Sequence, residues 1–247
     1  MGSYDYKEGK KRLFDILDNK TTVIEKDEVP SDSAFNFENG IKAPVASIFV
    51  DIRHSTEFFK NNPRDRVARI IRAFTSEVIR ILRSDENFRD LGIRGDCVFA
   101  VYSASSNEEI SDIFSCAVLV NTFLKMINKG LSDKKWPELK VGIGLGYDAN
   151  ELVIKTGEKG SGYNDFVWIG NAVIDASNCC DVANKKGLNP IVISNFFYDK
   201  LKNEKANDNE TYGQMFEKVH SSDYGGNVYH ANIIRTDFNK WIAEGMK

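Results

Sequence analysis

Two aspartates stand where the chain leaves apolar segments, and their surroundings are suited to chemistry. Asp51 ends the apolar run "VASIFV", and Asp96 follows Gly95 between two short apolar runs, "LGIR" and "CVFAVY". An ionised carboxylate at the end of a buried segment is costly unless a partner or a cation compensates its charge. Two carboxylates that share one site repel each other unless a divalent cation neutralises them.

A pair of carboxylates suits phosphoryl transfer. Mg²⁺ is typically held by one or two carboxylates, water and substrate phosphates, and paired metal ions assist in-line displacement at phosphorus. Ser55 and Thr56 follow Asp51 closely and are expected to cap a short helix, whose first backbone N–H groups can bind phosphate. Together these features predict two-metal nucleotide chemistry.

The segments around these residues predict the elements that position them. Apolar residues from Val67 to Leu82 recur at three- and four-residue spacing, which predicts an amphipathic helix that begins near Asn62-Pro63. The apolar runs on either side of Gly95-Asp96 predict a hairpin, and a second long helix is expected after Asn107. Further strands are expected at "LKVGIGLGYD", "ELVIKTG", "FVWIG" and "PIVIS", with a helix over 171–184.

The order β-α-β-β-α-β is that of the split βαβ, ferredoxin-like plan. We therefore expect an α+β fold with an antiparallel-rich sheet and helices on one face. In this plan the first strand lies beside the central hairpin, so both aspartates converge at one edge of the sheet. The other face needs a cover, which dimerisation would supply. Gly142, Gly144 and Gly146 share one face of a strand and are expected to permit close packing of a helix or a partner.

Three segments are expected along the chain. Residues 1–42 form an N-terminal helix and linker arm, with an amphipathic helix over Tyr4 to Asp18. Residues 43–236 form the compact domain, and residues 237–247 form a C-terminal tail. The arm is either a docking segment or a simple lead-in to the domain, and both interpretations stay open.

Composition narrows the class of partner. The 247 residues are 42% hydrophobic and 28% charged, with a formal net charge of −3, so electrostatics favour neither nucleic acid nor an anionic membrane. The N-terminus lacks the apolar core of a signal peptide, and no stretch is expected to span a membrane. The four cysteines form no CxxC pair, which indicates structural thiols in a reducing cytosol. We therefore expect a cytoplasmic protein.

The motifs themselves resemble those of the class III nucleotidyl cyclase family. "FVDIRHST" is similar to the family's first metal motif, "GIRGDCVFAVY" to its second, and "LKVGIGLGYD" and "VWIGNAVIDASN" to two later elements. The four motifs occur in the family's order between Ala43 and Arg235. The resemblance implies a class III cyclase homology domain that forms a homodimer, with active sites at the interface between two copies.

The resemblance also implies roles for individual residues. Asp51 and Asp96 would bind two divalent metal ions, Mn²⁺ or Mg²⁺, with the Ile52 carbonyl as a further ligand. Lys140 stands where the family has a phosphate-binding arginine. Backbone amides would hold the triphosphate of the nucleotide substrate; they belong to Ile52, Arg53, His54, Ser55 and Thr56.

Departures from the family pattern concern the base. The positions that read a purine in adenylate and guanylate cyclases are Gly92 and Val167 here, and neither side chain can pair with a purine edge. The chain resembles more closely the bacterial Pycsar cyclases, which make cyclic UMP or cyclic CMP in antiphage defence. This implies conversion of UTP to 3′,5′-cyclic UMP as a signal for a cyclic-nucleotide-sensing effector, with Arg53 as a base or phosphate contact. The alternatives are a cytidylate cyclase, a purine cyclase with a rebuilt pocket, or a silent binding module.

A further departure concerns the transition state. The family's Asn and Arg, four residues apart, fall on Ile174 and Asn178. Asn178 is therefore a catalytic candidate, while the charge that the arginine would supply is absent from its usual place. Arg53, Arg94 and Lys185 are the cations that could replace it.

Overall fold

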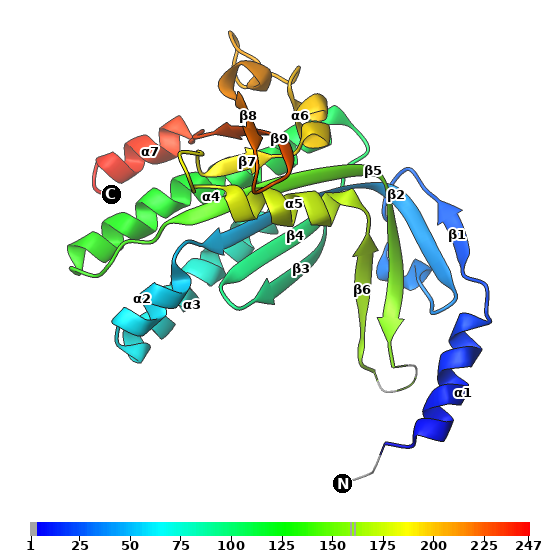
Figure 1. Ribbon diagram of the computed structural model, residues 1–247. Helices are drawn as coiled ribbons and strands as arrows, with labels where there is room; N and C mark the ends of the chain where they lie inside the picture. The colour runs from blue at the N-terminus through cyan, green and yellow to red at the C-terminus, as the bar shows by residue number, and fades with distance from the viewer. Residues whose placement is uncertain (1–3, 159, 161) are drawn as a thin grey trace.

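The computed structural model describes residues 4–158, 160 and 162–247, so the first three residues of the expected arm lie outside the described part. Within it, one mixed sheet runs in the order β3-β4-β2-β5-β7-β9-β8, with β1 beside β2 and β6 beside β5 (Figure 1). Only the β1–β2 and β5–β7 pairs are parallel. The strands are β1 (Thr22–Glu25), β2 (Asn39–Ile52), β3 (Phe88–Arg94), β4 (Cys97–Ser103), β5 (Val141–Gly157), β6 (Asn164–Ile169), β7 (Ile191–Ile193), β8 (Glu217–Ser221) and β9 (Gly226–Ala231).

The helices lie around this sheet, and the predicted β-α-β-β-α-β order is confirmed, with an additional first strand, β1. The helices are α1 (Tyr6–Leu17), α2 (Ser55–Asn61), α3 (Arg64–Leu82), α4 (Asn107–Asp133), α5 (Asn171–Val182), α6 (Asn195–Leu201) and α7 (Thr236–Ala243), with 3₁₀ turns at Asp32–Ala34 and Tyr212–Met215.

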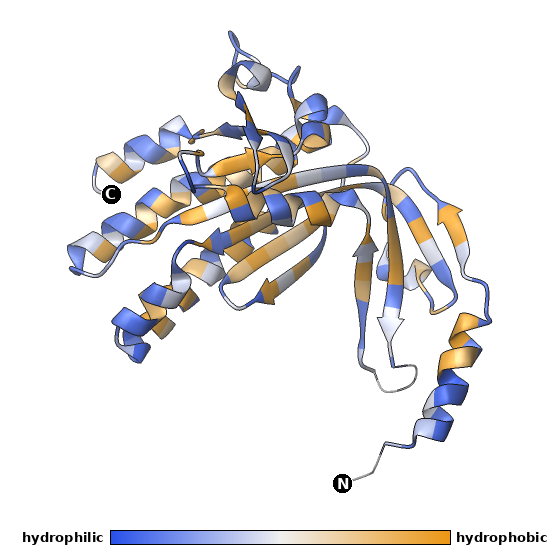
Figure 2. Cartoon of the chain, in the orientation of Figure 1, coloured by the Kyte–Doolittle hydropathy of each residue, from blue (hydrophilic) through white to orange (hydrophobic). Residues whose placement is uncertain are grey.

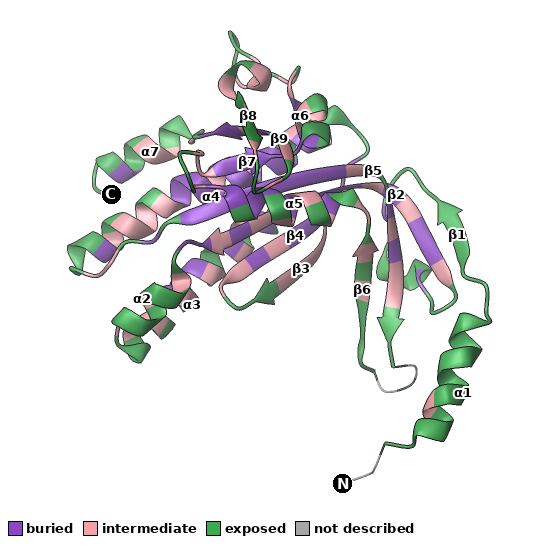
Figure 3. Cartoon of the chain, viewed as in Figure 1, coloured by how far each residue is buried: buried purple, intermediate pink, exposed green. Residues whose placement is uncertain are grey.

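The main core lies between the sheet and helices α3, α4 and α6. Its strand residues include Ile48 and Val50 of β2 and Ile143 and Leu145 of β5. Helix α4 begins with a capping box, in which the Ser106 hydroxyl accepts from the amide of the third helical residue and that residue's carboxylate accepts in return. Figure 3 shows the central strands buried along most of their length.

Helix α4 is more apolar than the sequence analysis suggested. This helix is long and apolar enough to cross a membrane by length and composition, whereas the sequence suggested no such stretch. However, 56% of its apolar window is buried inside the protein. Core helices pass the same test, and the packing of α4 against the sheet is that of a core helix.

Helix α5 lies on the opposite face of the sheet, which corrects the expectation of helices on one face only. Successive strand residues point to opposite faces, so Gly144 and Gly146 point away from the main core. A Cβ at either position would overlap the backbone of α5, at Ala176 and Cys180 for Gly144 and at Ala172 and Ala176 for Gly146. The close packing predicted for these glycines is confirmed, and the packing partner is a helix of the same chain.

The same outer face also carries a second apolar cluster. Val29 and Phe35, from the segment before β2, pack there with Phe166 and Trp168 of β6. The Trp168 indole donates a 2.8 Å hydrogen bond to Asp90 of β3, which fastens β6 over the edge of the sheet. The chain therefore covers part of this face itself.

The ends of the chain differ from one another. Helix α1 buries no residue and projects from the body of the protein (Figure 1), although Figure 2 shows apolar residues on it. At the other end, the segment expected to be a tail contains α7, whose Ile242 is buried, and Lys125 of α4 donates to Asn239 at 3.1 Å. The expected boundary between residues 42 and 43 falls inside β2.

Candidate active site

The two predicted metal carboxylates lie close enough to interact. Asp51 is the last residue but one of β2 and lies opposite Gly142 of β5, and Asp96 occupies the turn between β3 and β4, where Gly95 has a left-handed φ of 65°. Burial raises the pKa of Asp51, and the negative charge of Asp96 raises it further, while Arg53 opposes the rise. The structure therefore brings together two carboxylates that lack full compensation.

The donor set fits a divalent cation. The Oδ2 atom of Asp96 is buried and has no hydrogen-bond partner, which is unfavourable for a carboxylate unless a cation reaches it. In the described part of the chain no three His, Cys, Asp or Glu side chains form a metal-binding group. Any cation here would therefore take its remaining ligands from backbone carbonyls, water or substrate. Cys97 is beside the pair, and burial with the nearby carboxylates raises the pKa of its thiol to about 12, so it stays neutral.

The turn after Asp51 lies against the start of β5. Ile52 pairs with Val141, and the Arg53 amide donates to the Lys140 carbonyl at 2.7 Å. The Arg53 amide, expected to bind phosphate, is therefore already engaged. His54 adopts a left-handed conformation with φ of 56° and caps α2 without a side-chain hydrogen bond. The first amides of α2 have no acceptor within the helix.

The Arg53 side chain has different surroundings from those expected. Its side chain is only 3% exposed, and its guanidinium contacts Asp51 and the carbonyl of Cys180 on α5. A base or phosphate in solution has no access to a group this deeply buried. The expected substrate contact is thus not supported by the geometry.

The remaining predicted residues lie apart from the carboxylate pair. Gly92 of β3 faces Phe99 across the hairpin, and the Phe99 ring fills the space that a side chain at position 92 would need. Val167 is partly exposed on β6, and Asn178 is exposed on α5. Within the described residues no hydrogen bond or ion pair joins these three to Asp51 or Asp96.

Sequence reasoning named Lys185 as a possible replacement cation but missed Asp181, which lies near the C-terminal end of α5. Asp181 and Lys185 both act on the Asp51 carboxylate, Asp181 raising its pKa and Lys185 lowering it. Asn178 and Asp181 are three residues apart within α5, which places them on one side of the helix, whereas Lys185 follows the end of the helix at Val182. The three-residue spacing was the signal in the sequence that could have found Asp181.

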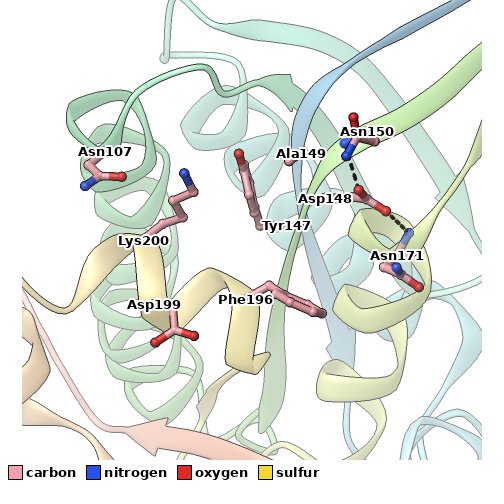
Figure 4. A pocket seen from close by; sticks show the side chains of 9 residues that line it. All are labelled: Asn107, Tyr147, Asp148, Ala149, Asn150, Asn171, Phe196, Asp199 and Lys200. Atoms are coloured by element: carbon pink, nitrogen blue, oxygen red, sulfur yellow. Dashed lines mark hydrogen bonds between the residues drawn. The ribbon is translucent and has the colours of Figure 1, made fainter.

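The opposite end of α5 borders an open pocket of about 530 Å³. Figure 4 shows Asp148 between Asn150 and Asn171, accepting a hydrogen bond from each amide, at 2.8 and 2.9 Å. Beside Asp148, the fully buried Glu151 accepts from the Ala172 amide at 3.0 Å. Two carboxyl groups therefore accept hydrogen bonds from the first backbone amides of α5, which have no acceptor within the helix. The pocket contains none of the predicted site residues.

The Glu151 carboxyl predicts a pH-dependent stability. Burial raises the pKa of Glu151 from about 4.5 to about 7, helped by the charge of Asp148. Between these values the folded protein keeps a proton that the unfolded chain has lost, so stability falls as pH rises from about 4.5 to about 7. We expect Glu151→Gln, which keeps an oxygen acceptor for the Ala172 amide, to flatten this part of the melting-temperature profile. The exposed Glu108→Gln is the matched control, and equal slopes in wild type and Glu151→Gln would contradict the assignment.

The fold matches that of class III nucleotide cyclases. The adenylyl cyclase CyaB of P. aeruginosa superposes with a TM-score of 0.65 at 16% identity, over 80% of this chain and 98% of that one. The guanylyl cyclase Cya2 gives a TM-score of 0.63 at 14% identity, over 81% and 97% of the two chains. The chain thus has the class III cyclase fold, as predicted. No protein-family model matches the sequence.

Relatives at the sequence level define the family. A uridylate cyclase of Treponema porcinum is 42% identical over 243 residues, which is 98% of this chain and 82% of the relative. A uridylate cyclase of Gulbenkiania mobilis is 32% identical, over 98% and 97% of the two chains. The chain belongs to the uridylate cyclase family.

Proposed function

We propose that the protein converts UTP to 3′,5′-cyclic UMP and pyrophosphate. The observation that carries the proposal is the Asp51–Asp96 pair with its unpartnered buried oxygen, in a chain whose relatives are named uridylate cyclases. A purely binding module has no need of two repelling carboxylates at one site. Retention of this pair therefore favours an enzyme over a silent module.

The residues around the pair have distinct roles in this reaction. Asp51, Asp96 and the Ile52 carbonyl would hold two divalent ions, Mn²⁺ or Mg²⁺, which when bound neutralise phosphate charge and assist ionisation of the ribose 3′-hydroxyl. The first amides of α2, at His54, Ser55 and Thr56, bind the triphosphate together with the exposed Lys140. Attack of the 3′-oxygen on the α-phosphorus forms one P–O bond and breaks the bond to the β-phosphate oxygen. Pyrophosphate leaves, and the hydroxyl proton passes to solvent.

Selection of a pyrimidine follows from what the base-facing positions lack. Neither Gly92 nor Val167 offers a hydrogen-bonding side chain, so these positions lack the groups with which adenylate and guanylate cyclases read a purine edge. The Phe99 ring over Gly92 also fills the space that a longer side chain would need. These features support UTP or CTP as the substrate, and the names of the relatives favour UTP.

The assembly and its biological role belong to the same proposal. Asn178 is exposed on α5 and is available to a nucleotide held between two copies, with Arg94 or Lys185 supplying positive charge near the transferred phosphate. We propose a cytoplasmic homodimer with active sites at its interface. Its cyclic product would serve as an antiphage signal for a separate effector.

The experiment that tests the activity uses four substrates in parallel. The purified protein is incubated with UTP, CTP, ATP or GTP and Mn²⁺, and cyclic products are identified by mass. We expect cyclic UMP to dominate. Cyclic CMP as the main product would reassign the substrate, cyclic AMP or GMP alone would refute pyrimidine selection, and no product from any nucleotide would refute the enzyme.

A further inference from the structure

Arg53 is the most deeply buried cation near the candidate metal site, and its contacts are specific. Its Nη1 atom lies 3.5 Å from Oδ2 of Asp51. Its Nη2 atom donates to the Cys180 carbonyl at 2.6 Å and contacts the Cys180 sulfur at 3.3 Å. One guanidinium therefore joins the end of β2 to the end of α5.

The surrounding structure is shaped to hold this guanidinium. It lies flat against Gly142 of β5, where a Cβ would overlap three of its atoms. The Cys180 thiol in turn donates to the Gly142 carbonyl at 3.3 Å, so α5, β5 and Arg53 form one contact set. The Nε atom of Arg53 is buried without a hydrogen-bond partner, which is energetically unfavourable.

The two contacts have complementary electrostatic reasons. The Cys180 carbonyl belongs to the last turn of α5, where the helix dipole is negative and favours a cation. Asp51 supplies the ionised carboxylate that a buried guanidinium requires. An arginine can serve both at once because its nitrogens form a planar fork, whereas lysine offers a single charged point.

We propose that Arg53 is a positioning residue that fixes the Asp51 carboxylate and sets the distance between the metal site and α5. The inference rests on the proposed cyclase function. Holding Asp51 through Oδ2 leaves the other oxygen for a cation. Anchoring Cys180 also fixes the helix that carries Asn178, two residues earlier in the sequence. Arg53 thereby aligns the two halves of the site without touching the nucleotide.

The test uses two variants that disturb the same contact differently. Arg53→Met removes the guanidinium, and Gly142→Ala keeps it but forces its flexible tip to move. Mn²⁺ binding is measured without nucleotide, from the loss of the free Mn²⁺ paramagnetic signal, and kcat and KM for UTP are measured separately. Arg80→Met is the matched control, because Arg80 is exposed and pairs with Glu77 of the same helix at 3.5 Å.

In both variants we expect the Mn²⁺ dissociation constant to rise about 10-fold, as for loss of a group that orients a metal ligand. We expect kcat to fall about 100-fold, with KM for UTP changed less than about threefold. In the double variant the Gly142→Ala effect should vanish, because the group that it displaces is gone. Arg53→Lys should not restore kcat.

Each other outcome overturns the inference. A rise in KM with unchanged Mn²⁺ binding would make Arg53 a substrate contact. Unchanged Mn²⁺ binding in a folded Gly142→Ala protein would refute the positioning role, even if Arg53→Met fails to fold. If wild type gives no cyclic product, the proposed function fails, while the Mn²⁺ titration still decides the role of Arg53.

Discussion

Asp96→Asn is expected to reduce turnover by at least about 10³-fold without lowering the melting temperature. In the proposed mechanism the substitution removes a metal ligand, and the metal ions would stabilise the charge of the transferring phosphate by several kcal/mol. The substitution also removes the charge repulsion between residue 96 and Asp51. It replaces a carboxylate that has a buried oxygen without a hydrogen-bond partner by an uncharged amide. Cyclic UMP formation and thermal unfolding, measured on the same preparation, check both halves of the expectation.

Asp51→Asn should abolish turnover equally but should also lower the melting temperature. The difference arises because Asp51 is the carboxylate beside the buried Arg53, whose charge would lose its compensation. Asp133→Asn is the control, since that exposed carboxylate pairs with Lys129 of its own helix, far in the sequence from Asp51 and Asp96. Retention of more than a tenth of wild-type kcat in Asp96→Asn would contradict the metal assignment.

Gly144→Ala is expected to lower the free energy of unfolding by about 3 kcal/mol, at the upper end for overpacking of a core. The added methyl group would overlap the backbone at Ala176 and Cys180, and a helix backbone cannot yield as a side-chain tip can. Displacing α5 also moves Asn178 and the carbonyl that Arg53 holds, so turnover should fall as well. Chemical denaturation of the folded protein measures the first effect.

Gly130→Ala is the matched control for this experiment. Gly130 lies inside α4, and nothing lies within 4 Å of where its Cβ would be. Alanine there should raise stability by about 0.5–1 kcal/mol, because glycine is a poor helix former. Equal effects of the two substitutions would show that α5 does not pack on β5 as described.

Most of the fold could be predicted because its elements carry strong local signals. The helical stripe from Val67 to Leu82 and the alternating glycines of β5 each reflect one element and its packing. The expected helix over 171–184 corresponds to α5, Asn171–Val182. By contrast, β1 has four exposed residues. Its β-branched residues favour a strand, but the run is short and lies in a polar segment without an alternating pattern.

Part of the site depended on contacts that no local pattern contains. The position of Asp51 at a strand end was readable, because the apolar run stops there. The direction of the Arg53 side chain could not be predicted from the sequence. It depends on the space over Gly142 and on the Cys180 carbonyl, and both residues are far from Arg53 along the chain. The face that α5 covers was undetermined for the same reason, since glycine indicates close approach but not which partner approaches.

The central position of β2 has a consequence for how the protein matures. This strand pairs with β4 on one side and β5 on the other, and both partners follow it by long stretches of sequence. Non-local pairings of this kind form slowly, because closing the long loop lowers the conformational entropy before the stabilising contacts have formed. During synthesis Asp51 is made before its pairing partner in β5. A nascent or truncated chain that lacks β5 therefore cannot form the complete candidate site. The proposed activity should therefore appear only after most of the chain has been synthesised and folded.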